Sequence, residues 1–208
     1  REKIRLVAPL SVDQFHVMAS KDVASIQDLA GKKVNFGPTD GGTFMTSSVV
    51  FDALGIEVNI TTFPHKIALE KLRRGEIAAM TRASGKPVSI IEAVEPGEPF
   101  HLLAVPQEPL AGTYSATSLG YSDYPALIDP GKEVSTVAVA NALIGYNWPR
   151  DHQRGQAMAR FAKQLVSQYD KLRSNPYHES WKEIDLSLKV PGLKRHWSVE
   201  DALGTSPQ

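Results

Sequence analysis

Between residues 33 and 94, the sequence alternates three times between a short β-branched run and a segment whose apolar residues have helical spacing. The strand-like runs are Lys33–Phe36, Val58–Phe63 and Ile77–Met80, and a helical segment follows each of them. Two strands joined through a helix run parallel, because the helix carries the chain back across the face of the sheet. The alternation therefore predicts an α/β fold with parallel-dominated sheets and flanking helices.

The regions on either side of this alternation also have ordered character. Residues 4–10 and 15–19 have the composition of two short buried strands. Residues 134–146 form an apolar, β-branched run that is longer than a usual strand, so we expect it to bend or to cross between two lobes. Residues 151–173 present apolar side chains along one helical face, which predicts an amphipathic helix.

Composition excludes several classes of function. The chain has 208 residues, with 23 basic and 23 acidic side chains and a formal net charge of zero. This balance gives no reason to expect nucleic acid or an anionic membrane as a partner, because both require a basic surplus. The absence of cysteine excludes disulfides, thiolate metal sites and a cysteine nucleophile. No apolar run approaches the roughly 20 residues that span a bilayer, so direct membrane insertion is not expected.

A glycine-rich turn, Gly37-Pro38-Thr39-Asp40-Gly41-Gly42-Thr43, links the first strand of the alternation to the next helix. Glycines let backbone N–H groups approach a ligand, and a helix begins with unpaired N–H donors and a partial positive charge. The turn therefore predicts a site for a carboxylate, phosphate or sulfonate group. It matches neither the Walker motif nor GxGxxG, so nucleotide binding is not supported. The alternative is a plain turn in which Thr39 or Asp40 caps the helix.

Arg82 follows the strand-like run Ile77–Met80 directly. Ligands of parallel α/β sheets bind beyond the carboxyl ends of the strands, where the glycine-rich turn would also lie. Arg82 is therefore a candidate for a bidentate pair with a carboxylate. The alternative is an arginine in a solvated loop.

No set of residues has the spacing of a catalytic or metal centre. The six histidines are scattered, without the HxH or HExxH spacing of zinc sites. Ser84 lies outside the GxSxG pattern of hydrolases. We therefore expect no enzyme activity, no metal and no cofactor, and an enzyme built on the same fold is an alternative that predicts turnover of its ligand.

Several stretches, in order and spacing, resemble the TAXI family, the receptors of one class of TRAP transporters. Residues 28–43 (DLAGKKVNFGPTDGGT) are similar to the family pattern DLKGKRV-x-x-G-x-x-x-S-G-T. Residues 69–83 resemble its L-x-x-G-x-I-D-A segment, and residues 84–87 its x-G-x-P. Residues 136–143 look like its returning hinge strand, and residues 181–192 like its C-terminal pattern. The resemblance covers nearly the whole chain.

The resemblance implies a two-lobed periplasmic-binding-protein fold of type II, with a small ligand held in the cleft. The implied ligand is a small carboxylate such as an amino acid or a 2-oxo acid, and the implied partners are the subunits of a membrane permease. Localisation would be periplasmic or extracytoplasmic. The implied ligand-binding residues of the second lobe are Gly41, Gly42 and Thr43, and those at the cleft edge are Arg82, Ser84 and Lys86. Phe15 and His16 would approach from the first lobe, and Asn141 from the hinge.

Three departures from the family pattern affect these expectations. Gly41 stands where the family has serine, which removes one hydroxyl donor. Asp40 adds a negative charge that weakens carboxylate binding, unless it turns away or the ligand carries an amine or a metal. The family begins with a further β-α-β-α portion before the strand that matches residues 4–10, so we expect an incomplete first lobe, by trimming or by loss.

The expected lobes follow from these assignments. Residues 1–24 and 134–208 would form a partial first lobe, residues 25–112 the second lobe, and residues 113–133 a turn-rich return connection. The expected function is a solute-binding receptor that captures its ligand between the lobes and delivers it to a TRAP-type permease. The alternative is a ligand-sensing or partner-binding module of the same fold in a signalling protein.

Overall fold

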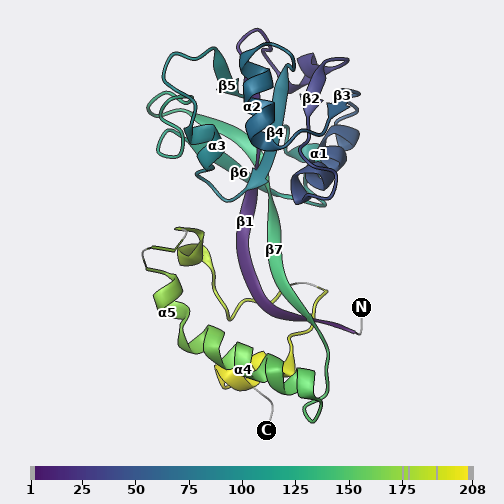
Figure 1. The fold of residues 1–208 in the computed structure, drawn as a ribbon, viewed down its shortest axis with the longest axis vertical. Helices are drawn as coiled ribbons and strands as arrows, with labels where there is room; N and C mark the ends of the chain where they lie inside the picture. Colours follow the sequence, from purple (N-terminus) through teal and green to yellow (C-terminus); the bar gives the residue numbers. More distant parts are fainter. Residues whose placement is uncertain (1–2, 175, 178, 191, 206–208) are drawn as a thin grey trace. The chain divides into compact units, whose positions relative to one another are not determined.

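The computed structural model describes residues 3–174, 176–177, 179–190 and 192–205. Its described strands form one seven-stranded sheet with the order β3-β2-β4-β1-β7-β6, in which β5 pairs with β1 (Figure 1). The strands are β1 (Ile4–Ser20), β2 (Lys33–Asn35), β3 (Asn59–Thr61), β4 (Ala79–Ser84), β5 (Phe100–Leu102), β6 (Ser115–Gly120) and β7 (Glu133–Tyr146).

The α-helices are α1 (Gly42–Ala53), α2 (His65–Arg73), α3 (Ser89–Glu92), α4 (Gln153–Ser167), α5 (Tyr169–Leu172) and α6 (Trp197–Leu203). Three short 3-10 helices complete the described elements: η1 (Ile26–Leu29), η2 (Glu108–Leu110) and η3 (Glu179–Glu183). The expected mixed α/β class is confirmed, and none of the helices among the described residues is both long and apolar enough to cross a membrane.

The parallel part of the sheet lies where the alternation predicted it. Strand β2 pairs in parallel with both β3 and β4. Strand β4 then pairs antiparallel with β1, from Gln14 opposite Ser84 to Ala19 opposite Ala79. The predicted break between residues 10 and 15 is wrong, because β1 runs unbroken from Ile4 to Ser20. Strand pairing, rather than local hydrophobicity, sets its length.

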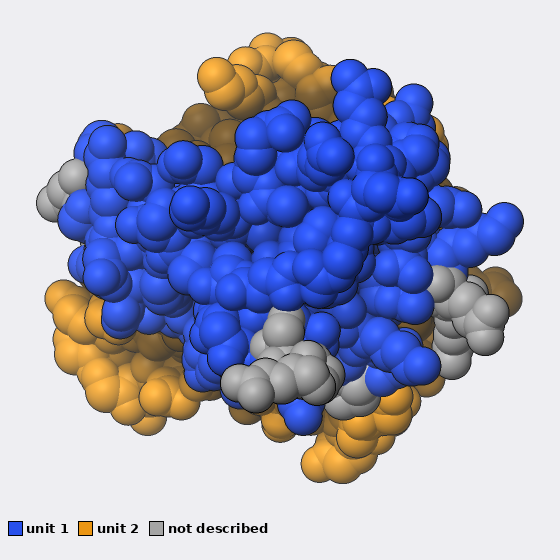
Figure 2. All heavy atoms as spheres, turned by 90° about the horizontal axis from the view of Figure 1, so that it is seen from below, with its two compact units in different colours: residues 1–11, 140–208 blue, residues 12–139 orange. Residues whose placement is uncertain are grey.

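The chain divides into two compact units, coloured separately in Figure 2: unit 1 is residues 1–11 and 140–208, and unit 2 is residues 12–139. The expected division was a first lobe of residues 1–24 and 134–208, a second lobe of residues 25–112 and a return connection of residues 113–133. The observed boundaries lie elsewhere, and the expected first lobe includes residues outside the described ones. Pairing explains the difference. The second half of β1 pairs with β4 and β5, and the unpredicted strand β6 pairs with β7, so both join the sheet of unit 2.

The sheet of unit 2 is buried on both faces, as a sheet between two helical layers requires. On one face, α1 packs through Val50 and Phe51 in the same cluster as Phe15 and Val17 of β1. On the other face, α2 packs through Leu69 and Leu72 in a cluster with Met18 of β1 and Met80 of β4. Met18 directly follows Val17, which belongs to the first cluster. Successive residues of β1 therefore point to opposite faces, and each face has its own core.

In unit 1, the predicted helix over residues 151–173 is two helices, because α4 ends at Ser167 and α5 begins at Tyr169. Helix α4 packs against α6, and Ala162 shares a small core with Val7 and Val199. A second small cluster of unit 1 contains Ala8, Ile184 and Leu186.

Candidate functional site

The glycine-rich turn and Arg82 lie at the same edge of unit 2, beyond the carboxyl ends of the parallel strands. The turn follows β2, while Arg82 lies on β4 beyond its pairing with β2, which includes Asn35 opposite Met80. Thr39, Asp40 and Gly42 are exposed, so the middle of the turn is open to solvent, while Gly37 and Thr43 at its ends are buried.

Helix α1 begins without a side-chain cap. Its N-cap residue is Gly41, so the alternative in which Thr39 or Asp40 caps the helix is wrong. The N–H of Gly41 donates to the carbonyl of Pro38 at 3.0 Å, which uses that donor inside the turn. The N–H groups of the first helical turn, beginning at Gly42, have no intrahelical partner and carry the positive end of the helix dipole.

The side chain of Arg82 contacts two neutral acceptors. Its Nη1 lies 2.9 Å from Nε2 of His65 and 3.4 Å from the hydroxyl of Thr43. Burial, and then the charge of Arg82, lower the pKa of His65 below its ordinary value, which keeps the imidazole neutral. The ion pairs of the described residues do not include Arg82, so its positive charge is not compensated by a carboxylate.

Thr43 connects α1 to β4. Its hydroxyl accepts the N–H of Ala83 at 3.2 Å and lies 3.5 Å from the carbonyl of the same residue. The side chain is buried. The expected role of the Thr43 hydroxyl as a ligand donor therefore does not agree with its position, because the hydroxyl already bonds to β4.

A chain of buried polar contacts lies beneath this edge and was not found from the sequence. Ser47 donates to the carbonyl of Thr43 at 2.7 Å, and its hydroxyl lies 2.7 Å from that of Thr81. The Thr81 hydroxyl donates to the carbonyl of Asn35, whose side-chain oxygen accepts the N–H of Phe63 at 2.8 Å. These contacts link the start of α1, β4, β2 and the loop before α2. Buried polar groups satisfied in this way fix the relative positions of the segments that carry them.

Phe15 and His16 require correction as ligand contacts. They are 1% and 0% exposed, and both belong to unit 2 rather than to a first lobe. Phe15 packs in the core with α1. Alternation along β1 places two successive side chains in the cores of opposite faces, which leaves neither available to a ligand.

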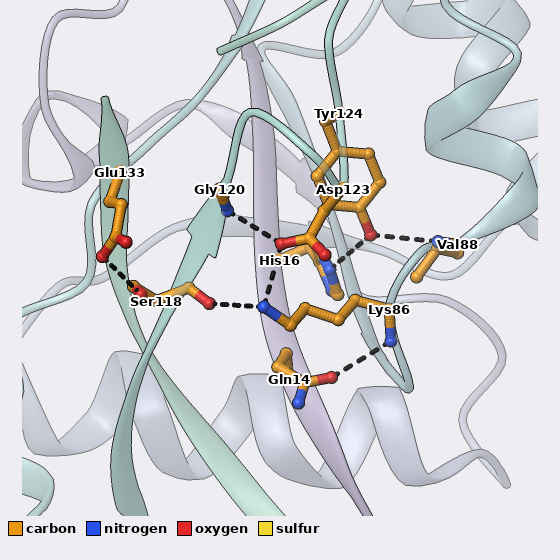
Figure 3. A network of polar contacts seen from close by, with 9 residues as sticks. All are labelled: Gln14, His16, Lys86, Val88, Ser118, Gly120, Asp123, Tyr124 and Glu133. Carbon is orange, nitrogen blue, oxygen red and sulfur yellow. Dashed lines mark hydrogen bonds and ion pairs between the residues drawn. The ribbon is translucent and has the colours of Figure 1, made fainter. Parts of the chain in front are cut away.

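The partners of His16 hold its ring in one neutral form, and Figure 3 shows one of them, the Tyr124 hydroxyl, which also contacts Val88. Its Nδ1 lies 3.1 Å from the carbonyl of Arg82, which can only accept, so Nδ1 carries the proton. Its Nε2 then accepts from the Tyr124 hydroxyl at 2.8 Å, while that hydroxyl accepts the N–H of Val88 at 3.0 Å. Burial lowers the pKa of His16 to about 4, which agrees with a neutral ring.

Lys86 is paired within unit 2. Its Nζ lies 2.9 Å from Oδ2 of Asp123 and donates to the carbonyl of Ser118 at 3.1 Å (Figure 3). Its backbone N–H donates to the side chain of Gln14 at 3.1 Å, next to Ser84 on β4. The side chains of Lys86 and Asp123 are 28% and 15% exposed, so the pair is largely withdrawn from water. The charge of Lys86 is therefore already compensated.

Two predicted residues remain. Asp40 is exposed within the glycine-rich turn, whereas Asn141 lies on β7 within unit 1 and is not part of this cluster of unit 2. Among the described residues, no group of three or more histidine, aspartate or glutamate side chains is arranged to hold a metal ion. The cluster at the edge therefore consists of Arg82, His65, the start of α1 and the glycine-rich turn.

The profile of the NMT1-like family matches residues 1–190. Among solved structures, the chain resembles one described as the periplasmic sulfonate-binding protein SsuA of a sulfonate ABC transporter from Methylobacillus flagellatus. The identity is 12%, the TM-score is 0.50, and the match covers 87% of this chain and 47% of that one. At this identity the likeness concerns the fold alone, and it confirms the expected periplasmic-binding-protein fold.

Two further structures have lower TM-scores. The amino acid ABC transporter substrate-binding protein AbpA from Streptococcus pneumoniae, bound to L-arginine, has 16% identity and a TM-score of 0.41, with 86% of this chain and 62% of that one covered. An ABC transporter periplasmic binding protein from Brucella ovis, with glutathione bound, has 12% identity and a TM-score of 0.43, with 97% and 59% covered. The chain thus spans about half the length of the first structure and less than two thirds of the other two.

Proposed function

The chain belongs to the NMT1-like family, and from this premise we propose that it is an extracytoplasmic solute-binding receptor that captures a small carboxylate-bearing ligand. Binding is reversible and involves no chemical change of the ligand. The protein then delivers the ligand to a membrane permease, of the TRAP type that the sequence resemblance implies.

The observation that carries the proposal is the uncompensated charge of Arg82 beside the start of α1. Its guanidinium lies 3.4 Å from the hydroxyl of Thr43, the second residue of the helix. A guanidinium and unpaired helix N–H groups both prefer an anion, and a planar carboxylate can pair with two N–H groups of arginine at once. The exposure of Gly42 leaves the start of the helix open to such a group.

The net charge of unit 2 indicates that short-range contacts, rather than a long-range field, would supply the affinity for an anion. Residues 12–139 contain 10 basic and 15 acidic side chains, a net charge of −5. A field of this sign does not attract anions from a distance, so the affinity must come from short-range donors. The proposed contacts are therefore Arg82 and the N–H groups that follow Gly41, with Ser84, on the same strand as Arg82, as a further candidate.

Native mass spectrometry and calorimetry test this proposal. We expect purified protein to carry a small anion, or to bind at least one of L-glutamate, 2-oxoglutarate and ethanesulfonate. Arg82→Ala should weaken that binding more than tenfold, because charged hydrogen bonds contribute about 1.5–3 kcal/mol. Lys171→Ala, at an exposed position of α5, is the control and should leave affinity unchanged. If the wild type binds no small anion under any of these conditions, the proposal is wrong.

A further inference from the structure

His65 is a histidine that sequence spacing does not distinguish, yet it lies against the central cation of the proposed site. It is the first residue of α2 and is half-buried. Its Nε2 lies 2.9 Å from Nη1 of Arg82. This contact joins the start of α2 to the end of β4 at the edge where the glycine-rich turn also lies.

The chemistry of the two groups fixes the direction of this hydrogen bond. A guanidinium has only donors, so Nε2 of His65 accepts and the proton of the neutral ring is on Nδ1. Protonation of the ring would remove the acceptor and place two positive charges within 2.9 Å of each other. Arg82 therefore requires a neutral His65.

Gly37 makes room for the imidazole. Its backbone has a φ of +76°, and a Cβ on this residue would lie 2.7 Å from Cε1 of His65. The positive φ favours glycine here, and a side chain at this position would clash with the ring. Gly37 and Arg82 both lie close to the Cε1–Nε2 end of the imidazole.

The contacts of Arg82 all use one end of its guanidinium. Nη1 contacts His65 and Thr43, whereas Nε and Nη2 make no hydrogen bond to any residue that the structure describes. An arginine presents its donors in a rigid fork, so holding Nη1 also fixes the direction of the Nε–Nη2 edge. That edge has the two parallel N–H groups with which arginine binds a carboxylate side-on.

We propose that His65 is a positioning residue, which holds Nη1 of Arg82 so that the Nε–Nη2 edge is free and oriented for a carboxylate. This inference rests on the proposed function and deepens it, because it assigns the arginine edge that contacts the ligand. A neutral partner suits the role: a carboxylate in place of His65 would also hold Arg82 but would cancel the charge that the ligand needs.

The first test measures the contact itself and needs no ligand. NMR titration of the Cε1–H signal should give His65 a pKa below 6.5 in the wild type, because of burial and the charge of Arg82. In Arg82→Gln this pKa should rise, since the neighbouring charge is removed. Lys66→Ala, at the adjacent exposed position of α2, is the matched control and should leave the pKa unchanged. An unchanged pKa in Arg82→Gln would overturn the contact.

The second test measures the consequence for binding, with L-glutamate, 2-oxoglutarate and ethanesulfonate as probes in calorimetry. His65→Ala should weaken binding about fivefold, the effect of one hydrogen bond, while His65→Gln, which keeps an acceptor, should stay within about twofold. Gly37→Ala should resemble His65→Ala, because its methyl group displaces the ring.

The outcomes separate this inference from the proposed function. If Arg82→Ala abolishes binding while His65→Ala binds as the wild type does, the positioning role is wrong and the proposed function stands. If the wild type binds none of the probes, the proposed function fails in this form, and the NMR titration still decides whether His65 holds Arg82.

Discussion

Arg82 lies on β4 and Lys86 lies four residues later, just after the strand ends, and their surroundings differ in one decisive respect. Lys86 pairs with the carboxylate of Asp123, whereas Arg82 contacts two neutral groups, on His65 and Thr43. A cation paired with a carboxylate is already compensated and has little attraction left for a ligand. A cation held by neutral acceptors keeps its full charge for an anion. The partners of a cation, rather than its place along the strand, therefore distinguish a structural residue from a binding residue.

The two histidines that contact Arg82 also differ. His16 is completely buried and hydrogen-bonded at both ring nitrogens, one of them to the backbone carbonyl of Arg82. His65 contacts the guanidinium of Arg82 and is half-buried as a residue, and its Nδ1 is buried without a hydrogen-bond partner among the described residues. Both ring nitrogens of His16 have hydrogen-bond partners, as is usual for a polar side chain in a folded core. The arrangement of His65 leaves one ring nitrogen buried and unsatisfied by any residue that the structure describes.

The largest effect that we expect is the pH dependence of protein stability that His16 causes. The pKa of His16 is about 4 in the folded protein, below the 6.5 of the unfolded chain, so the unfolded state binds the proton more tightly. Its contribution to the free energy of unfolding is present above pH 6.5 and is lost as pH falls toward 4, by about 3 kcal/mol.

Urea unfolding between pH 7 and pH 4 measures this loss. In His16→Gln the part of the loss that belongs to His16 should vanish, so the curve of stability against pH should be flatter than in the wild type. Equal slopes in the two proteins would show that His16 is not held neutral by its surroundings.

A smaller effect concerns the ion pair itself. Asp123→Ala leaves Lys86 without its carboxylate in a largely buried setting, and it also removes the acceptor of the Gly120 N–H. We expect a loss of about 1–2 kcal/mol in the free energy of unfolding, reduced from the value for a fully buried pair because part of each side chain meets water. Chemical denaturation at pH 7 measures it. Affinity for L-glutamate or 2-oxoglutarate should change less than about twofold, since the pair is not a ligand contact.

The fold was predictable where a local pattern determines it. The alternation over residues 33–94 gave the parallel strands and their helices, because periodicity and terminating glycines act within a few residues. Strand β6 has no β-branched run and forms because β7 pairs with it, so only tertiary structure reveals it. The same dependence on pairing shifted the boundaries of the two units.

The part of the candidate site that follows directly from a local sequence pattern was also predictable. Arg82 stood out because it follows a parallel strand, and the structure places it at the expected edge. Lys86 follows the same strand, but its partner Asp123 is 37 residues away, and no spacing rule finds such a pair. His65 and Asn35 are important through contacts between segments, which a single sequence does not display. Phe15 was assigned to the ligand, whereas the stretch of β1 that contains it, residues 14–19, is buried on both faces.

The measurement that tests the account most directly compares Arg82→Ala and Lys86→Ala in the same experiment. Calorimetry with L-glutamate, 2-oxoglutarate and ethanesulfonate gives the affinity, and thermal unfolding gives the stability. We predict that Arg82→Ala weakens binding more than tenfold, a change of about 1.4 kcal/mol or more, with a melting temperature close to that of the wild type. Lys86→Ala should instead lower the melting temperature and keep its affinity. The opposite pattern, with binding lost in Lys86→Ala and retained in Arg82→Ala, would contradict the assignment of Arg82 as the anion-binding cation.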